Sequence, residues 1–128
     1  MRLLLDTHAF LWFILNDPLL SAKAAGLIAD PNNEIEISPA SYWEIAIKIS
    51  IGKYSLGEPI ADFFEREIAV NQFRILRIEP RHVAPVATMP FHHRDPFDRL
   101  IIAQAMVEQI PVVGADAAFD DYLVTRLW

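Results

Sequence analysis

The chain has 128 residues, 53% of them hydrophobic, and a formal net charge of −6 at pH 7. It has no cysteine, which excludes disulfides and thiolate metal sites and fits a cytoplasmic location, and its acidic balance argues against broad non-specific binding of nucleic acid. The length predicts a single domain over residues 1–128, and no apolar run reaches the roughly 18 residues of a membrane span.

The first half of the chain alternates short apolar runs with segments that have helical spacing. In chain order, the pattern predicts a strand at 2–5, helices at 7–15 and about 22–29, a strand at 34–38 and a helix at about 40–50. Ser21 is the expected N-cap of the second helix, because serine accepts hydrogen bonds from the first free backbone N–H groups.

The second half repeats this alternation. It predicts a helix that begins at Pro59, a strand at 73–78, a helix-like segment at 80–88, a helix that begins at Asp95-Pro96, a strand at 110–113, a turn or short helix at 117–121 and an edge strand at 123–125. Strands that alternate with helices predict an α/β fold with a mostly parallel central sheet.

Four carboxylates occupy comparable places in this pattern. Asp6 ends the first apolar run and Asp116 follows the run Val112-Val113-Gly114-Ala115, whereas Glu44 and Asp98 lie near the starts of predicted helices. The carboxyl ends of parallel strands and the starts of the following helices share one edge of a sheet, where ligands bind. We therefore expect one acidic cluster, whose oxygen-only ligands suit Mg²⁺ or Mn²⁺.

Each acid also has an ordinary structural interpretation. Asp6 could cap the helix that begins near Thr7, and Glu44 could form a capping box with Ser41. Glu44 is also four residues before Lys48, which favours an ion pair on one helix face.

The same holds for the later acids. Asp98 could interact with the helix dipole beside Asp95, and Asp116 could belong to an ordinary acidic loop with Asp120. His8, His92 and His93 are candidate bases or zinc ligands, although no metal-binding histidine pattern supports zinc.

An oxygen-ligated divalent cation favours phosphodiester hydrolysis, because it activates water and stabilises the attacking and leaving oxygens. Neither GxxxxGK[ST] nor GxGxxG occurs, which argues against a loop that cradles a nucleotide.

Four segments, in order along nearly the whole chain, resemble the PIN-domain family and, within it, the VapC-type toxins of prokaryotic type II toxin–antitoxin systems. The segments are Leu3-Leu4-Leu5-Asp6-Thr7-His8, Ser38-Pro39-Ala40-Ser41-Tyr42-Trp43-Glu44-Ile45-Ala46-Ile47-Lys48, His93-Arg94-Asp95-Pro96-Phe97-Asp98-Arg99-Leu100-Ile101-Ile102-Ala103-Gln104-Ala105 and Val113-Gly114-Ala115-Asp116. The resemblance implies a three-layer α/β/α fold, a Mg²⁺- or Mn²⁺-dependent ribonuclease acting on RNA, a homodimer and a cognate VapB-type antitoxin that blocks the site.

By motif, the resemblance implies that the four family acids are Asp6, Glu44, Asp98 and Asp116. Asp120 is an alternative for the fourth.

The resemblance also implies supporting residues. Thr7 matches the small polar residue that supports the first acid, Ser41 is expected to act similarly, and Asp95 matches an acid of this branch. Arg94 and Arg99 are expected to touch RNA phosphates or, as the favoured interpretation, Arg99 pairs with an acid and holds it in place.

The dimer has a further argument, because the aromatic residues on predicted helices exceed the obvious need of one small core; they are Phe10, Trp12, Phe13, Phe63 and Phe64. Two alternatives to the nuclease remain open. One is a Mg²⁺-binding receiver-like signalling module, which would normally show two adjacent acids after the first strand, and the other is a catalytically inactive PIN-like protein that only binds a partner.

Overall fold

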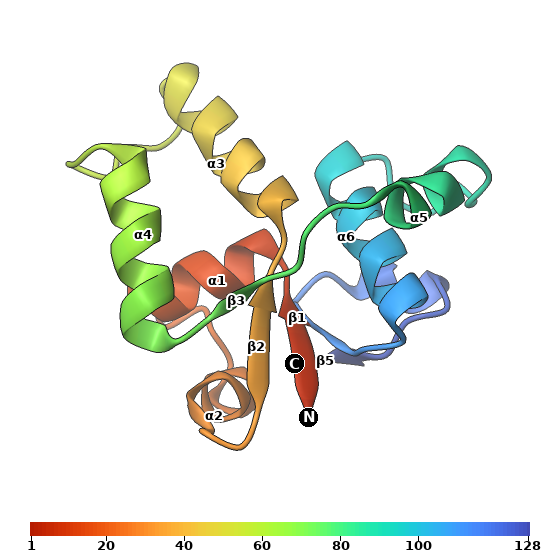
Figure 1. Cartoon of the computed structure of the whole chain (residues 1–128), viewed down its shortest axis with the longest axis horizontal. Helices are drawn as coiled ribbons and strands as arrows, with labels where there is room; N and C mark the ends of the chain where they lie inside the picture. The colour runs from red at the N-terminus through yellow and green to blue at the C-terminus, as the bar shows by residue number, and fades with distance from the viewer.

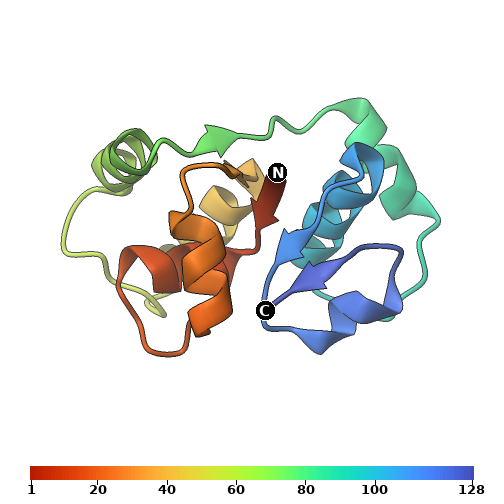
Figure 2. The ribbon, with the colours of Figure 1, turned by 90° about the horizontal axis from the view of Figure 1, so that it is seen from below.

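The computed structural model describes all residues from Met1 to Trp128. In Figure 1, strands β1 and β2 run side by side through the middle of the molecule, with helices α1 to α4 on the left and α5 and α6 on the right. Figure 2 shows the segment that contains β3 crossing from the first group of helices to the second. In chain order the elements are β1 (Arg2–Leu5), α1 (Thr7–Ile14), α2 (Ala22–Ala29), β2 (Glu34–Ile37), α3 (Pro39–Ser50), α4 (Ile60–Asn71), β3 (Arg74–Ile75), α5 (Pro80–Val83), the 3₁₀ helix η1 (Ala84–Ala87), α6 (Pro96–Glu108), β4 (Val112–Val113), the 3₁₀ helix η2 (Ala117–Asp121) and β5 (Arg126–Leu127).

The five strands form one sheet in the order β3-β2-β1-β4-β5, and every pair is parallel. The prediction of an α/β fold with a mostly parallel sheet is therefore confirmed. Leu5 at the end of β1 pairs with Ile37 of β2 on one side and with Val113 of β4 on the other. The three central strands thus end at one level, which brings the residues that follow them to one edge.

The core has two parts, one on each face of the sheet. Side chains alternate along β1, so Leu3 and Leu5 pack with α1, α2 and α4, whereas Leu4 packs with α6. Helices therefore cover both faces, and the α/β/α layering is confirmed.

Three aromatic residues that supported the dimer prediction belong to this core. Phe10, Phe63 and Phe64 are buried within the single chain, where Phe10 stacks on Phe64 at a centroid distance of 6.0 Å. The argument from excess aromatic residues was therefore wrong for these three, because the helices bury them against the sheet without a partner.

Helix starts are set by local chemistry, and two of the predicted starts are confirmed. Ser21 caps α2 and Asp95 caps α6, with Pro96 at the first helical position. The predicted capping box of Ser41 and Glu44 was wrong. Ser38 caps α3 instead, because Pro39 takes the first helical position and begins the helix earlier.

The edge strands are shorter than predicted. The strand predicted at 73–78 pairs only at β3, and the chain then leaves the sheet where Gln104 Nε2 donates to the carbonyls of Leu76 and Arg77. The strand predicted at 123–125 lies instead at β5 (Arg126–Leu127), because these two residues are the ones that pair with Val112 and Val113 of β4.

The helix-like segment predicted at 80–88 is divided into α5 and η1, with Pro85 inside the 3₁₀ turn. None of the helices combines the length and the apolar character required to cross a lipid bilayer.

A charged network fixes α6 to the sheet at the end opposite the acids. Glu108 at the end of α6 accepts hydrogen bonds from Arg2 at 3.1 Å and from the fully buried His82 at 3.0 Å, and it pairs with Arg81 at 2.7 Å. Hydrogen bonds from His82 and then Arg2, together with the charge of Arg81, outweigh burial and lower the pKa of Glu108 to about 2.

We expect Glu108→Gln to lower the free energy of unfolding at pH 7 by about 1–3 kcal/mol, because it removes charge-assisted hydrogen bonds. A lowered folded-state pKa stabilises the fold above the ordinary value of 4.5, and this contribution is lost as the pH falls towards about 2. Urea titrations should therefore show the two proteins converging over that interval. Glu34→Gln is the control, since its 3.5 Å pair with Arg74 is exposed. A difference for Glu108→Gln that does not shrink on acidification would contradict this account.

Candidate metal centre

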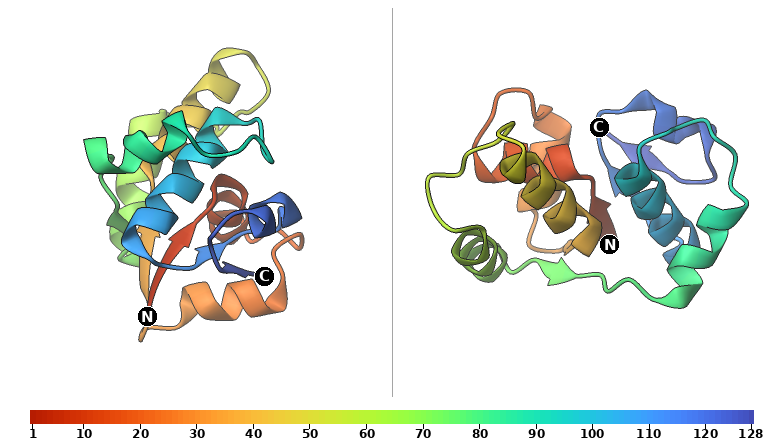
Figure 3. Two further views of the ribbon diagram at one scale, coloured as in Figure 1. Left: turned by 90° about the vertical axis from the view of Figure 1, so that its right-hand side faces the viewer. Right: turned by 90° about the horizontal axis from the view of Figure 1, so that it is seen from above.

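The four predicted acids lie at the carboxyl edge of the sheet. Asp6 follows β1, Asp116 follows β4, Glu44 lies on α3 and Asp98 lies in the first turn of α6. The right panel of Figure 3 views this edge from above, with α3 and α6 next to each other. Each of these acids contributes to the electrostatics of Asp6 or Asp98, so we call Asp6, Glu44, Asp98 and Asp116 the acid cluster.

Asp6 is both a helix cap and a member of the acid cluster. Its Oδ1 accepts a hydrogen bond from Ala9 N at 2.7 Å, while its Oδ2 lies against Gly114, where an added Cβ would be 2.5 Å away. Burial is the main cause that raises the pKa of Asp6 to about 7, and the charges of Glu44 and Asp116 add to it against the Ala9 hydrogen bond. The fold thus holds this carboxylate where ionisation is costly.

Glu44 has one satisfied and one unsatisfied oxygen. Its Oε2 lies 3.2 Å from Lys48 Nζ, which confirms the predicted ion pair along α3. Its Oε1 is buried and has no hydrogen-bond partner. A buried polar atom without a partner costs about 1–3 kcal/mol, so this oxygen is suited to a cation or to a water that a cation holds.

Asp98 and Asp116 meet at His93. The Nε2 atom of His93 lies 3.1 Å from Asp98 Oδ2 and 2.8 Å from Asp116 Oδ2, and ligand atoms of the three residues lie within 4.8 Å of one another. Burial is again the largest cause that raises the pKa of Asp98 to about 8, and the charges of Asp95 and the rest of the acid cluster add to it.

Of the two candidates for the fourth acid, Asp116 lies with Asp98 against His93. The Asp116 side chain is 46% exposed. Burial acts to raise its pKa, but hydrogen bonds from Ala118 N and His93, with further electrostatic contributions from His93 and Arg126, outweigh burial and lower the pKa. Asp120 instead forms a two-hydrogen-bond pair with Arg126 at 2.9 and 3.0 Å. The geometry thus places Asp116, and not Asp120, beside Asp98.

The other predicted residues have distinct positions. Thr7 Oγ1 donates to Ser41 Oγ at 3.0 Å, and this buried contact joins α1, which Asp6 caps, to α3, which carries Glu44. Asp95 Oδ1 accepts hydrogen bonds from Phe97 N and Asp98 N as the cap of α6.

The favoured interpretation of Arg99 was wrong. Its side chain is 4% exposed and pairs with no acid, and its guanidinium lies 4.0 Å from the ring centroid of Phe91. One residue along a helix is a rotation of about 100°, so Arg99 faces the 86–93 segment while Asp98 faces the acid cluster. It donates to the carbonyl oxygens of Val86, Met89, Pro90 and His93.

Sequence reasoning did not place His93 in the site. It grouped His93 with His8 and His92 as candidate bases or zinc ligands, but His8 is exposed and stacks on Trp12 at 5.2 Å, and His92 is exposed. The only signal in the sequence that distinguished His93 from the other two histidines was that it lies just before the Asp95-Pro96 helix start.

The residues fit a hard divalent cation. The cluster supplies carboxylate oxygens, Glu44 Oε1 lacks a partner, and Gly114 leaves room for Asp6. A cation among these oxygens would compensate the burial and repulsion that raise the pKa values of Asp6 and Asp98. Asp6 and Asp98, with Glu44 and Asp116, are the residues that could hold it.

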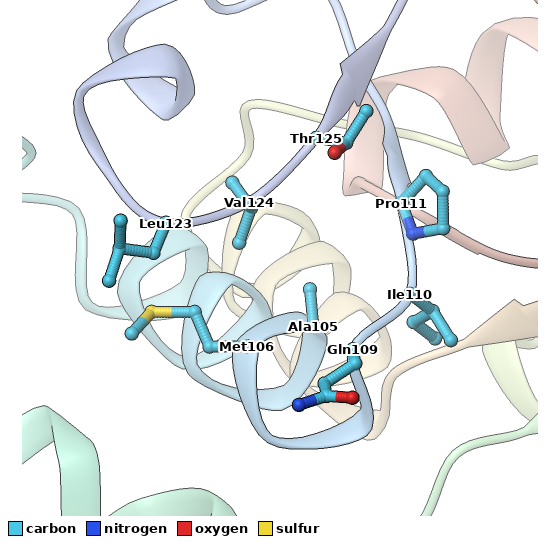
Figure 4. Close-up of a pocket in the computed structure, with 8 residues that line it drawn as sticks. All are labelled: Ala105, Met106, Gln109, Ile110, Pro111, Leu123, Val124 and Thr125. Carbon is cyan, nitrogen blue, oxygen red and sulfur yellow. The ribbon is translucent and has the colours of Figure 1, made fainter.

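A cavity of about 450 Å³ lies away from these acids, between the end of α6 and the segment before β5 (Figure 4). No lining side chain is ionisable between pH 2 and pH 10, so none of them can act as a general acid or base there. The lining residues are Ala105, Met106, Gln109, Ile110, Pro111, Leu123, Val124 and Thr125.

Comparison with known proteins gives a family and a fold. The model of the PIN domain matches residues 3–123. Similar solved structures are VapBC2 from Rickettsia felis bound to a DNA fragment from their promoter (17% identity, TM-score 0.69, 99% of this chain and 98% of that chain), FitAcB from Neisseria gonorrhoeae (17%, 0.65, 97% and 95%) and VapBC-1 from nontypeable Haemophilus influenzae (16%, 0.63, 99% and 97%). No curated protein matches.

We expect Gly114→Ala to weaken Mn²⁺ binding by about tenfold or more, because the new Cβ displaces the Asp6 carboxylate, and outer contacts of this kind set metal affinity on that scale. Isothermal titration calorimetry measures the change. Gly26→Ala is the matched control, because a Cβ there meets no atom within 4 Å. Equal Mn²⁺ affinity in wild type and Gly114→Ala would show that Asp6 does not contribute to a metal site.

We expect Asp98→Asn to raise the melting temperature of the metal-free protein near pH 8. The folded-state pKa of Asp98 is about 8, above the ordinary value of 3.8. At pH values between these two, the folded protein binds more protons than the unfolded protein, so the fold loses stability as the pH rises from about 4 to 8. Asparagine does not ionise, so the gain should vanish near pH 4, and at pH 8 it must exceed a dipole loss of about 0.3–1 kcal/mol.

Thermal scans in EDTA and in Mg²⁺ measure both effects. Mg²⁺ should stabilise the wild type more than the variant, because it binds the folded site. If the variant melts at a lower temperature than the wild type in EDTA, and Mg²⁺ raises both melting temperatures equally, Asp98 contributes to the helix alone and not to a metal site.

Proposed function

The chain belongs to the PIN domain family, and from this premise we propose that it is a Mg²⁺- or Mn²⁺-dependent endoribonuclease that hydrolyses RNA phosphodiester bonds. The observation that carries the proposal is the acid cluster, in which the charges of Asp6, Glu44 and Asp116 all act on Asp98 and buried Glu44 Oε1 has no protein partner. Such a cluster is costly without a cation and useful with one.

Each acid has a proposed role that follows from its surroundings. Asp6 and Asp98 bind the metal directly, since the charges of Glu44 and Asp116 act on both of these carboxylates. Asp116, half-exposed, binds through water or holds a second ion. When bound, the cation activates a water and neutralises phosphate charge.

Glu44 is proposed to ligate the metal or to orient the attacking water. Lys48 fixes one carboxylate oxygen at 3.2 Å and leaves Oε1 to accept a hydrogen bond from that water.

The alternatives lack a supporting observation. A receiver-like module requires acids that this chain places elsewhere, with Thr7 and His8 after Asp6. An inactive PIN-like partner-binding protein does not require four acids at one sheet edge.

We also propose that the protein is the toxin of a type II toxin–antitoxin pair, acting in the cytoplasm and masked by a VapB-type antitoxin. The similar structures of VapBC2 and VapBC-1 support this proposal. An apolar groove of about 440 Å³ between α3, α4 and β3, with Tyr42, Phe64 and Ile68 among its lining residues and Glu65 at its wall, offers a surface for an apolar antitoxin segment with a basic residue.

A homodimer remains a proposal on different grounds from the buried aromatics. Large apolar side chains stay exposed on the single chain, among them Trp43, Phe91 and Leu123. Closed twofold dimers are the commonest way to cover such surfaces.

The proposed activity predicts that purified protein cleaves RNA with Mg²⁺ or Mn²⁺ and stops in EDTA. Asp6→Asn and Asp98→Asn should each lower kcat by about a hundredfold or more, because each removes a metal-binding charge. Asp62→Asn is the matched control, since Asp62 is exposed on α4 and does not act on Asp6 or Asp98. Gel assays with defined RNAs measure the rates, and full activity of the wild type in chelator would refute the proposal.

A further inference from the structure

We propose that His93 is a positioning residue of the acid cluster: it holds Asp98 and Asp116 with the hydrogen on Nε2, and it is not itself a metal ligand. We further propose that Tyr122 and Arg99 keep His93 in that place. The inference rests on the proposed metal-dependent function and assigns roles within that site.

The hydrogen bonds of the ring define its tautomer. His93 Nδ1 accepts a hydrogen bond from Asp95 N at 3.1 Å, so Nδ1 carries no hydrogen and the neutral ring carries its hydrogen on Nε2. Nε2 is therefore the ring nitrogen that donates, and its N–H points to the carboxylates.

This tautomer gives His93 a different role from the two acids beside it. A histidine binds a metal through a ring nitrogen with a free lone pair, and Nε2 has none while it carries the hydrogen. Proximity of His93, Asp98 and Asp116 is therefore not a three-ligand site. Instead, Nε2 donates to Asp116 Oδ2 at 2.8 Å and also lies 3.1 Å from Asp98 Oδ2.

The position of this N–H beside both acids has an electrostatic effect. Asp98 belongs to α6, whereas Asp116 follows β4, and the two negative charges repel each other. A single N–H between them offsets part of that repulsion and fixes the relative position of two acids from separate elements. Hydrogen bonds of this kind to ligating carboxylates orient the ligands and tune metal affinity.

Tyr122 and Arg99 hold the backbone of His93 from both sides. Tyr122 Oη accepts from His93 N at 2.8 Å and donates to the Pro90 carbonyl at 2.7 Å. Arg99 Nη1 donates to the same Pro90 carbonyl at 2.9 Å and to the His93 carbonyl at 3.3 Å. Neither Tyr122 nor Arg99 touches a carboxylate of the cluster, so both act on the site through His93.

Mn²⁺ titration calorimetry on the full chain tests the role of His93. We expect His93→Ala to weaken Mn²⁺ binding by about tenfold or more, and His93→Gln to recover part of the loss because its amide also donates. His8→Ala is the matched control, since the exposed His8 ring stacks on Trp12 and contacts neither the acids nor Tyr122. Unchanged or tighter binding by His93→Ala would overturn the inference.

Tyr122→Phe tests the positioning through Tyr122 with the smallest change, because it removes one oxygen and keeps the ring. It should weaken Mn²⁺ binding in the wild type and have little further effect in the His93→Ala background. Equal effects in both backgrounds would show that Tyr122 does not act through His93.

Nitrogen-15 NMR of the ring reports the tautomer directly and does not depend on any variant folding. We expect Nε2–H in the metal-free protein and with Mg²⁺, and hydrogen on Nδ1 with metal at Nε2 would overturn the inference. Neither measurement uses RNA. A wild type that binds no Mn²⁺ would refute the proposed function and this inference together, whereas wild type and His93→Ala that bind equally would refute the inference alone.

Discussion

The level at which β1, β2 and β4 end brings four carboxylates together against their mutual repulsion. Leu5 pairs with Ile37 and with Val113, so the residues after these strands converge at one edge. Burial and repulsion raise the pKa of Asp6 to about 7 and that of Asp98 to about 8. The fold therefore places carboxylates at one edge where ionisation is costly, and a divalent cation bound there would offset that cost.

Much of the surrounding structure serves to hold that edge. The Thr7–Ser41 contact ties α1 to α3, Gly114 leaves space for the Asp6 carboxylate, and Lys48 fixes one oxygen of Glu44. At the other end of α6, Glu108 anchors the helix to the sheet. The anchor at one end lets α6 present Asp98 at the other without relying on contacts within the acid cluster.

The sequence pattern predicted correctly those elements whose bounds depend on a few neighbouring residues. The buried strand at 2–5 and the Asp95-Pro96 helix start needed only a few neighbouring residues, and the parallel sheet then placed the acids at one edge. The contacts of Arg99 and His93 were not predictable in this way, because they depend on a segment positioned by Tyr122, 29 residues from His93. The predicted bounds of the two edge strands were wrong for the same reason, since pairing at the edges depends on where the chain leaves the sheet.

The central claim is that the acid cluster is a divalent metal site, and anomalous diffraction from crystals soaked in Mn²⁺ tests it most directly. The account predicts an anomalous peak coordinated by carboxylate oxygens of Asp6 and Asp98, with Glu44 and Asp116 around it and His93 Nε2 outside the coordination shell. An absent peak, a peak elsewhere on the molecule, or a Mn²⁺ ion bound by the His93 nitrogen would contradict it.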